Sequence, residues 1–369
     1  MTANKVEYWE ARSKAARHLR SMLTALVVGV GSFHLRGVNL LSKYYNGVGV
    51  LNAGMPINFC VGNRSTGKSY YWKRYAVRDY LRNGNQFIYV RRYQNDIDLV
   101  TDSYFKDIGQ EPDLLPHKLE LIDNTFYCDG KVMGNAISLS TAYKYKSVPH
   151  DNTNTIILDE FLPDNLQYLK PMRPTYEPEQ VLNLYMTVAR GRNRPIRDEV
   201  KVICIANLVT LYNPYFAYFG IEPTGLGRFK NDGVYCEIFK NDEIAEEIRN
   251  SKIGRILERT TYGSYALDNA ALLDSKRHIV KRLPAKVYVW FCLWFNDWYM
   301  CYIDDEDNIY FKKGYDKTAK NKYAVTPPEH DINIPLFTGT VLKAVRRYND
   351  LDRIYYLSGE AKSNIGGIL

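Results

Sequence analysis

Residues 62–69, with the sequence GNRSTGKS, constrain the fold more than any other stretch of this chain. They match the phosphate-loop pattern G-x-x-x-x-G-K-[ST] at every required position. The apolar run at 57–61 predicts a buried strand, and residues 69–83 predict a helix that ends at Gly84. A strand, a glycine loop and a helix start direct backbone N–H groups and the helix dipole at one anion. A chance match in a glycine-containing turn is the alternative, and these flanking elements argue against it.

The loop predicts a site for ATP together with Mg²⁺. We expect Lys68 to bridge the β- and γ-phosphates and Ser69 to hold Mg²⁺. The predicted ATP-binding residues are Gly62, Arg64, Ser65, Thr66, Gly67, Lys68 and Ser69.

A second strand-forming run, at 155–158, is followed by the adjacent carboxylates Asp159 and Glu160. Ligands of open α/β sheets bind at the carboxyl ends of strands, so this run fits a Walker B element. Asp159 would then contact Mg²⁺, and Glu160 would orient and polarise the attacking water. Two solvated acids at a strand end are the alternative. The preceding phosphate loop in the same chain favours the catalytic interpretation.

Two further segments carry candidate residues. Residues 178–190 predict a helix with one buried face, and its end is the arginine-rich run RGRNR at 190–194. These arginines either neutralise a helix C-terminus or include an arginine finger that reaches the γ-phosphate of a neighbouring subunit. Residues 200–207 predict a buried strand that ends in Asn207. This side chain either senses the γ-phosphate or attacking water, or caps the strand.

Composition limits the remaining possibilities. A chain of 369 residues, 46% of them hydrophobic, is long enough for two folded domains and is not disordered. The net charge of +8 permits a polyanionic partner without requiring one. Six cysteines without a C-x-x-C pair predict buried, reduced thiols. No apolar run reaches the roughly 18 residues of a membrane span, so we expect a cytoplasmic protein with no membrane partner.

The remaining segments give a coarser picture. We expect a polar loop at 93–98 and strands at 119–128 and 131–136 joined by an Asp-Gly turn. An aromatic hairpin at 287–303, a third strand at 309–311, a helix at 338–357 and a mobile tail after Ser358 predict a small α/β module. This module shows no convincing triad of acids. The basic residues 1–42 form an N-terminal extension of unknown role.

From about residue 44 onward, the chain resembles the DNA-packaging ATPases of phi29-like podophages. The resemblance lies in NFCVG at 58–62, GKSY at 67–70, TIILDEF at 155–161, TVARGR at 187–192 and NPYF at 213–216. The string GNQFIYVRRY at 84–93 is its most specific part, because nucleotide binding in general does not require it.

The resemblance implies an α/β fold in which an additional-strand catalytic-glutamate (ASCE) P-loop ATPase domain precedes a small degenerate RNase H-like domain. We place the ATPase domain at 43–243, a linker at 244–275 and the vestigial nuclease domain at 276–369. Arg190 becomes the favoured trans-acting finger, with Arg192 beside it, and the resemblance does not decide between them.

The resemblance implies roles for further basic residues. Lys146 corresponds to a basic lid residue that faces the neighbouring nucleotide, and Arg64 to a residue that tracks the γ-phosphate. The DNA-facing loop lacks the lysine of the family, so Arg91, Arg92 or another loop is the alternative DNA contact.

The implied function is ATP-driven translocation of double-stranded viral DNA into a procapsid. A homo-oligomeric ring, expected to be a pentamer, would act in the host cytoplasm and dock transiently on the portal vertex, with a structural RNA as an optional partner. One alternative is a terminase whose C-terminal domain still cuts DNA with a metal held by Asp297, Asp304 or Asp305. Another is a nucleotide-switched assembly protein with negligible turnover.

Overall fold

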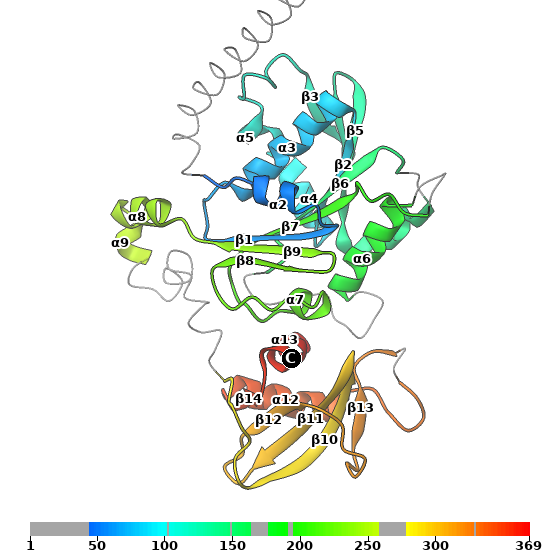
Figure 1. The fold of residues 1–369 in the computed structure, drawn as a ribbon, viewed down its shortest axis with the longest axis vertical. Helices are drawn as coiled ribbons and strands as arrows, with labels where there is room; N and C mark the ends of the chain where they lie inside the picture. Colours follow the sequence, from blue (N-terminus) through cyan, green and yellow to red (C-terminus); the bar gives the residue numbers. More distant parts are fainter. Residues whose placement is uncertain are drawn as a thin grey trace, which may run out of the picture. The chain divides into compact units, whose positions relative to one another are not determined.

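Two β-sheets organise the fold (Figure 1). The computed structural model describes residues 44–101, 103–147, 150–163, 176–190, 195–257, 278–327 and 330–369, without the side chains of residues 101, 146 and 147. In these ranges the larger sheet has nine strands in the order β3-β4-β5-β2-β6-β7-β1-β9-β8, and the smaller has five in the order β13-β10-β11-β12-β14. Each sheet contributes to a separate hydrophobic core.

The centre of the larger sheet is parallel. Strands β5, β2, β6, β7, β1 and β9 run in one direction, and antiparallel strands flank them at both edges. Their bounds are Lys131–Ser138, Gln86–Arg91, Thr153–Asp159, Lys201–Asn207, Ile57–Gly62 and Val234–Phe239. Strand β7 separates the phosphate-loop strand β1 from the Walker B strand β6, which is the additional strand that the ASCE fold class predicts.

Helices and short edge strands complete this part of the chain. Helix α3 spans Lys68–Asn83 and ends at Gly84, whose positive φ lets its N–H reach the Tyr80 carbonyl, as predicted. Helix α6 spans Glu177–Val188 and buries the predicted apolar face. The other elements are α2 Val48–Ala53, α5 Tyr104–Ile108, the 3-10 helix η1 Leu139–Ser147, α7 Pro214–Tyr218, β8 Gly227–Asn231, α8 Asp242–Asn250 and α9 Gly254–Leu257.

Two predictions in this region need correction. The loop expected at 93–98 is wrong, because α4 spans Gln94–Thr101. Asp96 accepts a hydrogen bond from the Tyr93 N–H at the start of this helix, and Ile97 is buried. The single strand expected at 119–128 is two strands, β3 Leu119–Ile122 and β4 Thr125–Cys128. Asp123 and Asn124 between them have φ of 48° and 62°, the conformation of a tight hairpin turn.

The smaller sheet begins with the predicted aromatic hairpin and third strand. Strands β10 (Val287–Phe295), β11 (Asp297–Asp304) and β12 (Ile309–Lys313) form an antiparallel meander. Strand β13 (Lys322–Ala324) pairs in parallel with β10, and β14 (Ile354–Tyr356) with β12. This arrangement gives the small α/β module that the sequence predicts.

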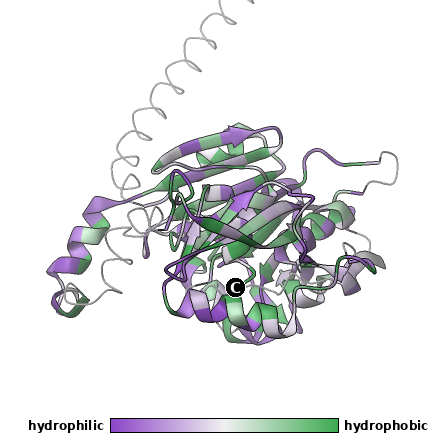
Figure 2. Cartoon of the chain, turned by 90° about the horizontal axis from the view of Figure 1, so that it is seen from below, coloured by the Kyte–Doolittle hydropathy of each residue, from purple (hydrophilic) through white to green (hydrophobic). Residues whose placement is uncertain are grey.

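The end of the chain differs from its prediction. The helix expected at 338–357 is α12, Gly339–Asp350, and residues beyond it form β14. The tail expected to be mobile contains α13, Gly359–Gly366. Ala361 and Ile365 of this helix are fully buried in the smaller core, so their apolar burial outweighs the glycines around them. Figure 2 shows hydrophobic and hydrophilic residues alternating along the helix near the C-terminus.

Two further expectations bear on the protein as a whole. All six cysteines are buried and none of them forms a disulfide, as predicted. In the part of the chain that the structure describes, no helix combines the length and the apolarity needed to cross a bilayer.

We predict that Ile365→Ala destabilises the smaller core, because it leaves a cavity in a fully buried site. The free energy of unfolding should fall by about 2–4 kcal/mol. Urea unfolding followed by tryptophan fluorescence would measure it, since Trp290, Trp294 and Trp298 lie in or beside β10 and β11. Ile332→Ala is the matched control, because Ile332 is 96% exposed. Equal effects of the two substitutions would contradict the packing of α13.

Candidate ATP-binding site

The phosphate loop joins the end of β1 to the start of α3. Ser65 and Gly67 adopt φ of 61° and 83°, so the chain turns sharply before the helix. Gly62 lies against β9, where a Cβ would come within 2.8 Å of the Phe239 carbonyl oxygen. Only glycine fits this approach without a shift of the backbone. The loop is therefore held between the sheet and the first turn of α3.

Lys68 lies inside the curve of this loop and is only 6% exposed. Its Nζ donates to the carbonyl oxygens of Asn63 and Gly62, at 2.8 and 3.2 Å, and to Thr66 Oγ1 at 3.2 Å. Burial lowers the pKa of Lys68 to about 8, and the charge of Arg64 adds a smaller effect in the same direction. A phosphate anion at this position would favour the charged ammonium and raise the pKa again.

Ser69 and Asp159 meet across the site. Ser69 Oγ donates to Asp159 Oδ1 at 3.0 Å, and Tyr89 Oη donates to Asp159 Oδ2 at 2.8 Å. A hydroxyl and a carboxylate are hard oxygen donors of the kind that Mg²⁺ prefers, so this pair fits the predicted metal ligands. Sequence reasoning missed Tyr89. It shares a face of β2 with Arg91, two residues on, and that alternation was the available signal.

Glu160 follows Asp159 in an unusual backbone conformation, with φ of 59°. Its side chain is 60% exposed, and its Oε2 accepts from Arg91 Nη2 at 2.6 Å. Arg91 Nη1 also lies 3.8 Å from Asp159 Oδ2. Arg91 thus lies in the site beside both carboxylates, and its contact with DNA stays a prediction.

Arg92 is also turned inward. It is buried, and its guanidinium pairs with the Glu177 carboxylate with an Nε to Oε1 distance of 2.6 Å. The hypothesis that Arg92 contacts DNA is not supported by this structure, because a buried and paired guanidinium presents no surface to a phosphate. The sequence gives no local sign that Arg92 is buried, because its partner Glu177 lies 85 residues away.

Asn207 ends β7 opposite Gly62 of β1. Its Oδ1 lies 3.5 Å from Lys68 Nζ, at the limit of a hydrogen bond. This predicted sensor is therefore close to the phosphate-binding lysine. Arg64 is partly buried in the loop itself.

Arg190 lies far from these residues along α6. The helix begins beside the site, where Glu177 pairs with Arg92, and it ends near the start of β6. There Arg197 donates to the carbonyls of Val188 and Thr153. Twelve residues of helix span about 18 Å, so exposed Arg190, two residues beyond the end of α6, lies toward the amino end of β6, whereas Glu160 follows its carboxyl end. Arg192 and the Lys146 side chain lie outside the described residues.

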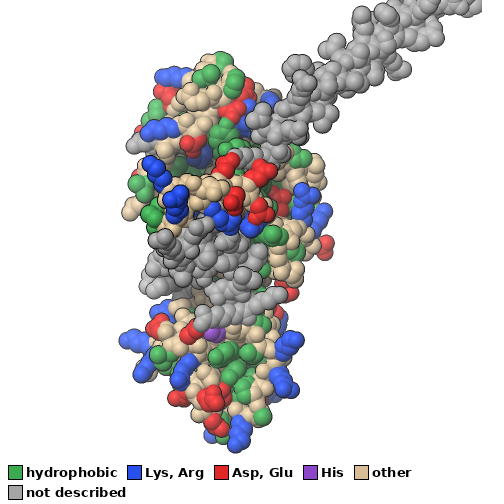
Figure 3. Space-filling view, turned by 90° about the vertical axis from the view of Figure 1, so that its left-hand side faces the viewer, with side chains coloured by type: hydrophobic (Ala, Val, Ile, Leu, Met, Phe, Trp, Pro, Cys, Tyr) green, Lys and Arg blue, Asp and Glu red, His purple; other side chains and the backbone are tan. Residues whose placement is uncertain are grey.

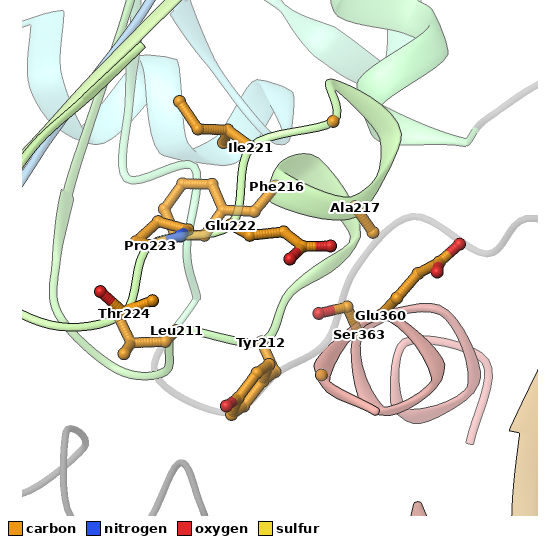
Figure 4. A pocket seen from close by; sticks show the side chains of 12 residues that line it. Leu211, Tyr212, Phe216, Ala217, Ile221, Glu222, Pro223, Thr224, Glu360 and Ser363 are labelled. Carbon is orange, nitrogen blue, oxygen red and sulfur yellow. The ribbon is translucent and has the colours of Figure 1, made fainter. Parts of the chain in front are cut away.

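A separate pocket of about 440 Å³ contains none of the predicted site residues (Figure 4). Tyr212, Phe216 and Glu222 line it from the region around α7, and Glu360 and Ser363 from α13. It is distinct from the phosphate loop.

The comparisons with known proteins agree with this geometry. A profile of the podovirus DNA encapsidation protein (Gp16) family matches residues 40–349. The DNA packaging protein of Bacillus phage phi29 is 35% identical over 303 residues, which are 80% of this chain and 87% of that protein. The DNA packaging protein of Bacillus phage B103 is 34% identical over 274 residues, 73% of this chain and 81% of that protein.

Solved structures show the same fold. A chain of the bacteriophage Phi-29 viral genome packaging motor assembly is 30% identical, with a TM-score of 0.60 over 88% of this chain and 97% of that chain. The Phi-28 gp11 DNA packaging motor is 17% identical and matches the fold with a TM-score of 0.64 over 88% and 96%. The predicted fold class, an ASCE P-loop ATPase with further α/β structure, is confirmed. This chain belongs to the podovirus DNA encapsidation protein (Gp16) family.

Proposed function

We propose that this protein is the ATPase of a viral DNA-packaging motor, which hydrolyses ATP to ADP and phosphate and thereby drives double-stranded DNA into a procapsid. The observation that carries the proposal is the convergence of Lys68, Ser69, Asp159 and Glu160 at the carboxyl ends of β1 and β6 in a chain of this family. The ATPase domain would span 43–243, with a linker at 244–275 and a C-terminal domain at 276–369.

The residues of the site divide the chemistry among them. The backbone N–H groups of the loop and Lys68 would hold the phosphates, and Ser69 and Asp159 would hold Mg²⁺. When bound, Mg²⁺ neutralises charge that develops on the β- and γ-phosphate oxygens. Glu160 would orient the attacking water and accept its proton, and Asn207 would contact the water or the γ-phosphate.

Glu160 has to leave Arg91 before it can orient water. The Glu160 side chain is 60% exposed, whereas Arg91 is only 15% exposed. Water can therefore solvate the carboxylate of Glu160 when it leaves the guanidinium. Arg91 would remain close to Asp159 after the exchange.

A second subunit would complete the site. Helix α6 leads away from Glu160 toward the amino end of β6, so Arg190 is poorly placed to reach the Glu160 of its own subunit. The separation supports a finger that acts on the neighbouring subunit, with Arg192 as the alternative finger and Lys146 as a lid residue. A ring of such subunits, pentameric in our proposal, would dock on the portal in the host cytoplasm.

DNA would be held through its phosphates, so its binding should weaken with salt and be indifferent to sequence. The net charge of +8 is not concentrated on the face drawn in Figure 3, where a group of acidic side chains lies among lysines and arginines. We therefore assign no DNA-binding residue on that face. A structural RNA remains an optional partner of the proposed motor.

The nuclease alternative gains no support from the positions of Asp297 and Asp304. Asp297 and Asp304 are the first and last residues of the eight-residue strand β11, so about 23 Å separate them. Asp297 pairs with Lys313, and Asp304 accepts hydrogen bonds from Asn308 and Tyr310. Carboxylates this far apart cannot share one metal ion.

We predict that Glu160→Gln lowers ATP hydrolysis at least about 100-fold, because the amide cannot accept the proton of the attacking water. Phosphate release would measure turnover, and a fluorescent ATP analogue would measure binding, which should change less than about three-fold because the phosphate loop is intact. Glu243→Gln, on the first turn of α8, is the matched control. Unchanged turnover in Glu160→Gln would favour the switch alternative instead.

We predict that Arg190→Ala abolishes hydrolysis without loss of ATP binding, a fall of about 10³-fold or more in turnover. Wild-type turnover per subunit should rise with protein concentration and with double-stranded DNA, and Arg347→Ala on the exposed side of α12 should behave as wild type.

Mixing the two inactive variants tests the trans arrangement. Each Glu160→Gln subunit supplies the arginine that its Arg190→Ala neighbour lacks, so the mixture should recover part of the lost activity. A finger that acts within its own chain predicts a mixture as inactive as either variant.

A further inference from the structure

We infer that Arg92, Glu177 and Tyr215 are positioning residues that fix the backbone at Glu160, and that they tie this turn to the helices α6 and α7. The inference rests on the proposed function, because it assigns these buried residues to the arrangement of the proposed catalytic glutamate. None of the three is expected to touch nucleotide.

The Arg92 guanidinium contacts three groups at once, one carboxylate and two backbone carbonyls. Its Nε and Nη2 donate to Glu177 Oε1 and Oε2, at 2.6 and 3.0 Å, in a bidentate pair. Its Nη2 also donates to the Phe161 carbonyl oxygen at 2.9 Å, and its Nη1 to the Glu160 carbonyl oxygen at 3.3 Å. One side chain directly after the end of β2 therefore holds two consecutive carbonyl groups directly after β6.

The turn at Glu160 needs such support. A left-handed φ in a residue other than glycine costs roughly 1–2 kcal/mol. Conformations of this kind persist where the surrounding structure over-determines them. On the other side of the turn, the Phe161 N–H donates to the Ile205 carbonyl oxygen, and the Phe161 ring packs against Phe59 and Tyr215 with ring centres 5.1 Å apart in each pair.

Glu177 joins this turn to two helices. It is 1% exposed and opens α6, and its Oε2 accepts from Tyr215 Oη of α7 at 2.7 Å as well as from Arg92. Removal of one partner from a buried ion pair is strongly destabilising, whereas replacement of a whole pair by apolar residues is often neutral. The stability of the core alone therefore does not require these charges at this place.

The Arg92–Glu177 pair fixes the position of Glu160. A shift of α6 or α7 would move Glu177, and Arg92 would pass that shift to the two carbonyl groups that it holds. Misplacement of a reacting group by about 1 Å can lower a rate 10²-fold. We call this set of contacts, from α6 and α7 through Glu177 and Arg92 to the turn, the relay. The relay makes the orientation of Glu160 depend on the positions of α6 and α7.

The first test compares turnover and binding in three variants. Arg92→Lys keeps the charge but loses the bidentate pair, and Tyr215→Phe removes one hydroxyl but keeps the packing. We expect kcat to fall at least about ten-fold in Arg92→Lys and about three-fold in Tyr215→Phe, with KM and the Kd of a fluorescent ATP analogue changed less than about three-fold. Arg78→Lys, whose guanidinium pairs with Asp113 and Glu111, is the control and should match wild type.

A double-mutant cycle separates positioning from a general loss of structure. If Arg92 acts through Glu160, Arg92→Lys should lower the residual rate of Glu160→Gln by less than two-fold, because the group it positions is already disabled. Equal fractional losses in both backgrounds would overturn the inference.

The outcomes also distinguish this inference from the proposed function. If Glu160→Gln turns over like wild type, the proposed catalytic role fails. If Glu160→Gln is inactive while Arg92→Lys and Tyr215→Phe match wild type, the relay fails and the proposed function stands. Thermal unfolding checks that each variant folds, and Tyr215→Phe alone decides the question if Arg92→Lys does not fold.

Discussion

The buried carboxylate of Asp159 is the contact on which the arrangement of the site depends. A charge that loses water must find hydrogen-bonding partners, and Asp159 finds them in Ser69 at the start of α3 and in Tyr89 on β2. These bonds fix the first turn of α3 against two neighbouring strands. The phosphate loop between β1 and α3 has little freedom left, so its N–H groups are oriented before any ligand arrives.

The end of β2 shows how one dipeptide serves two purposes. Arg91 is the last residue of β2 and Arg92 is the first residue after it, and their side chains separate even though the two residues are adjacent. Arg91 meets the carboxylates of Asp159 and Glu160, whereas Arg92 enters the core and pairs with Glu177. Two adjacent residues at the end of β2 thereby hold the side chain and the backbone of the same glutamate.

Sequence patterns predicted the parts of the structure that depend on neighbouring residues. The phosphate loop, the Walker B strand and the buried face of α6 follow from motifs and periodicity within a few residues. Helix α4 and the Asp123–Asn124 turn have local signals that the predictions overlooked. The other parts that were missed or wrongly predicted depend on distant partners. Strands β8 and β9 pair beside β1, the glycine-rich end of the chain folds because Ile365 enters a core formed by β10 to β14, and the burial of Arg92 requires Glu177. No local sequence pattern predicts these long-range contacts.

The course of α6 has a consequence for symmetry. A subunit whose nucleotide site lies at the carboxyl ends of the strands and whose arginine lies toward their amino ends has two unlike interaction faces. Unlike faces join head to tail, and such a contact repeats until the rotation between subunits closes a ring or, failing closure, continues as an open helix. In the ring proposed above, the number of subunits would follow from the angle between the two faces of one subunit. Substitutions that tilt α6 could change that number while every residue of the chemistry stayed the same.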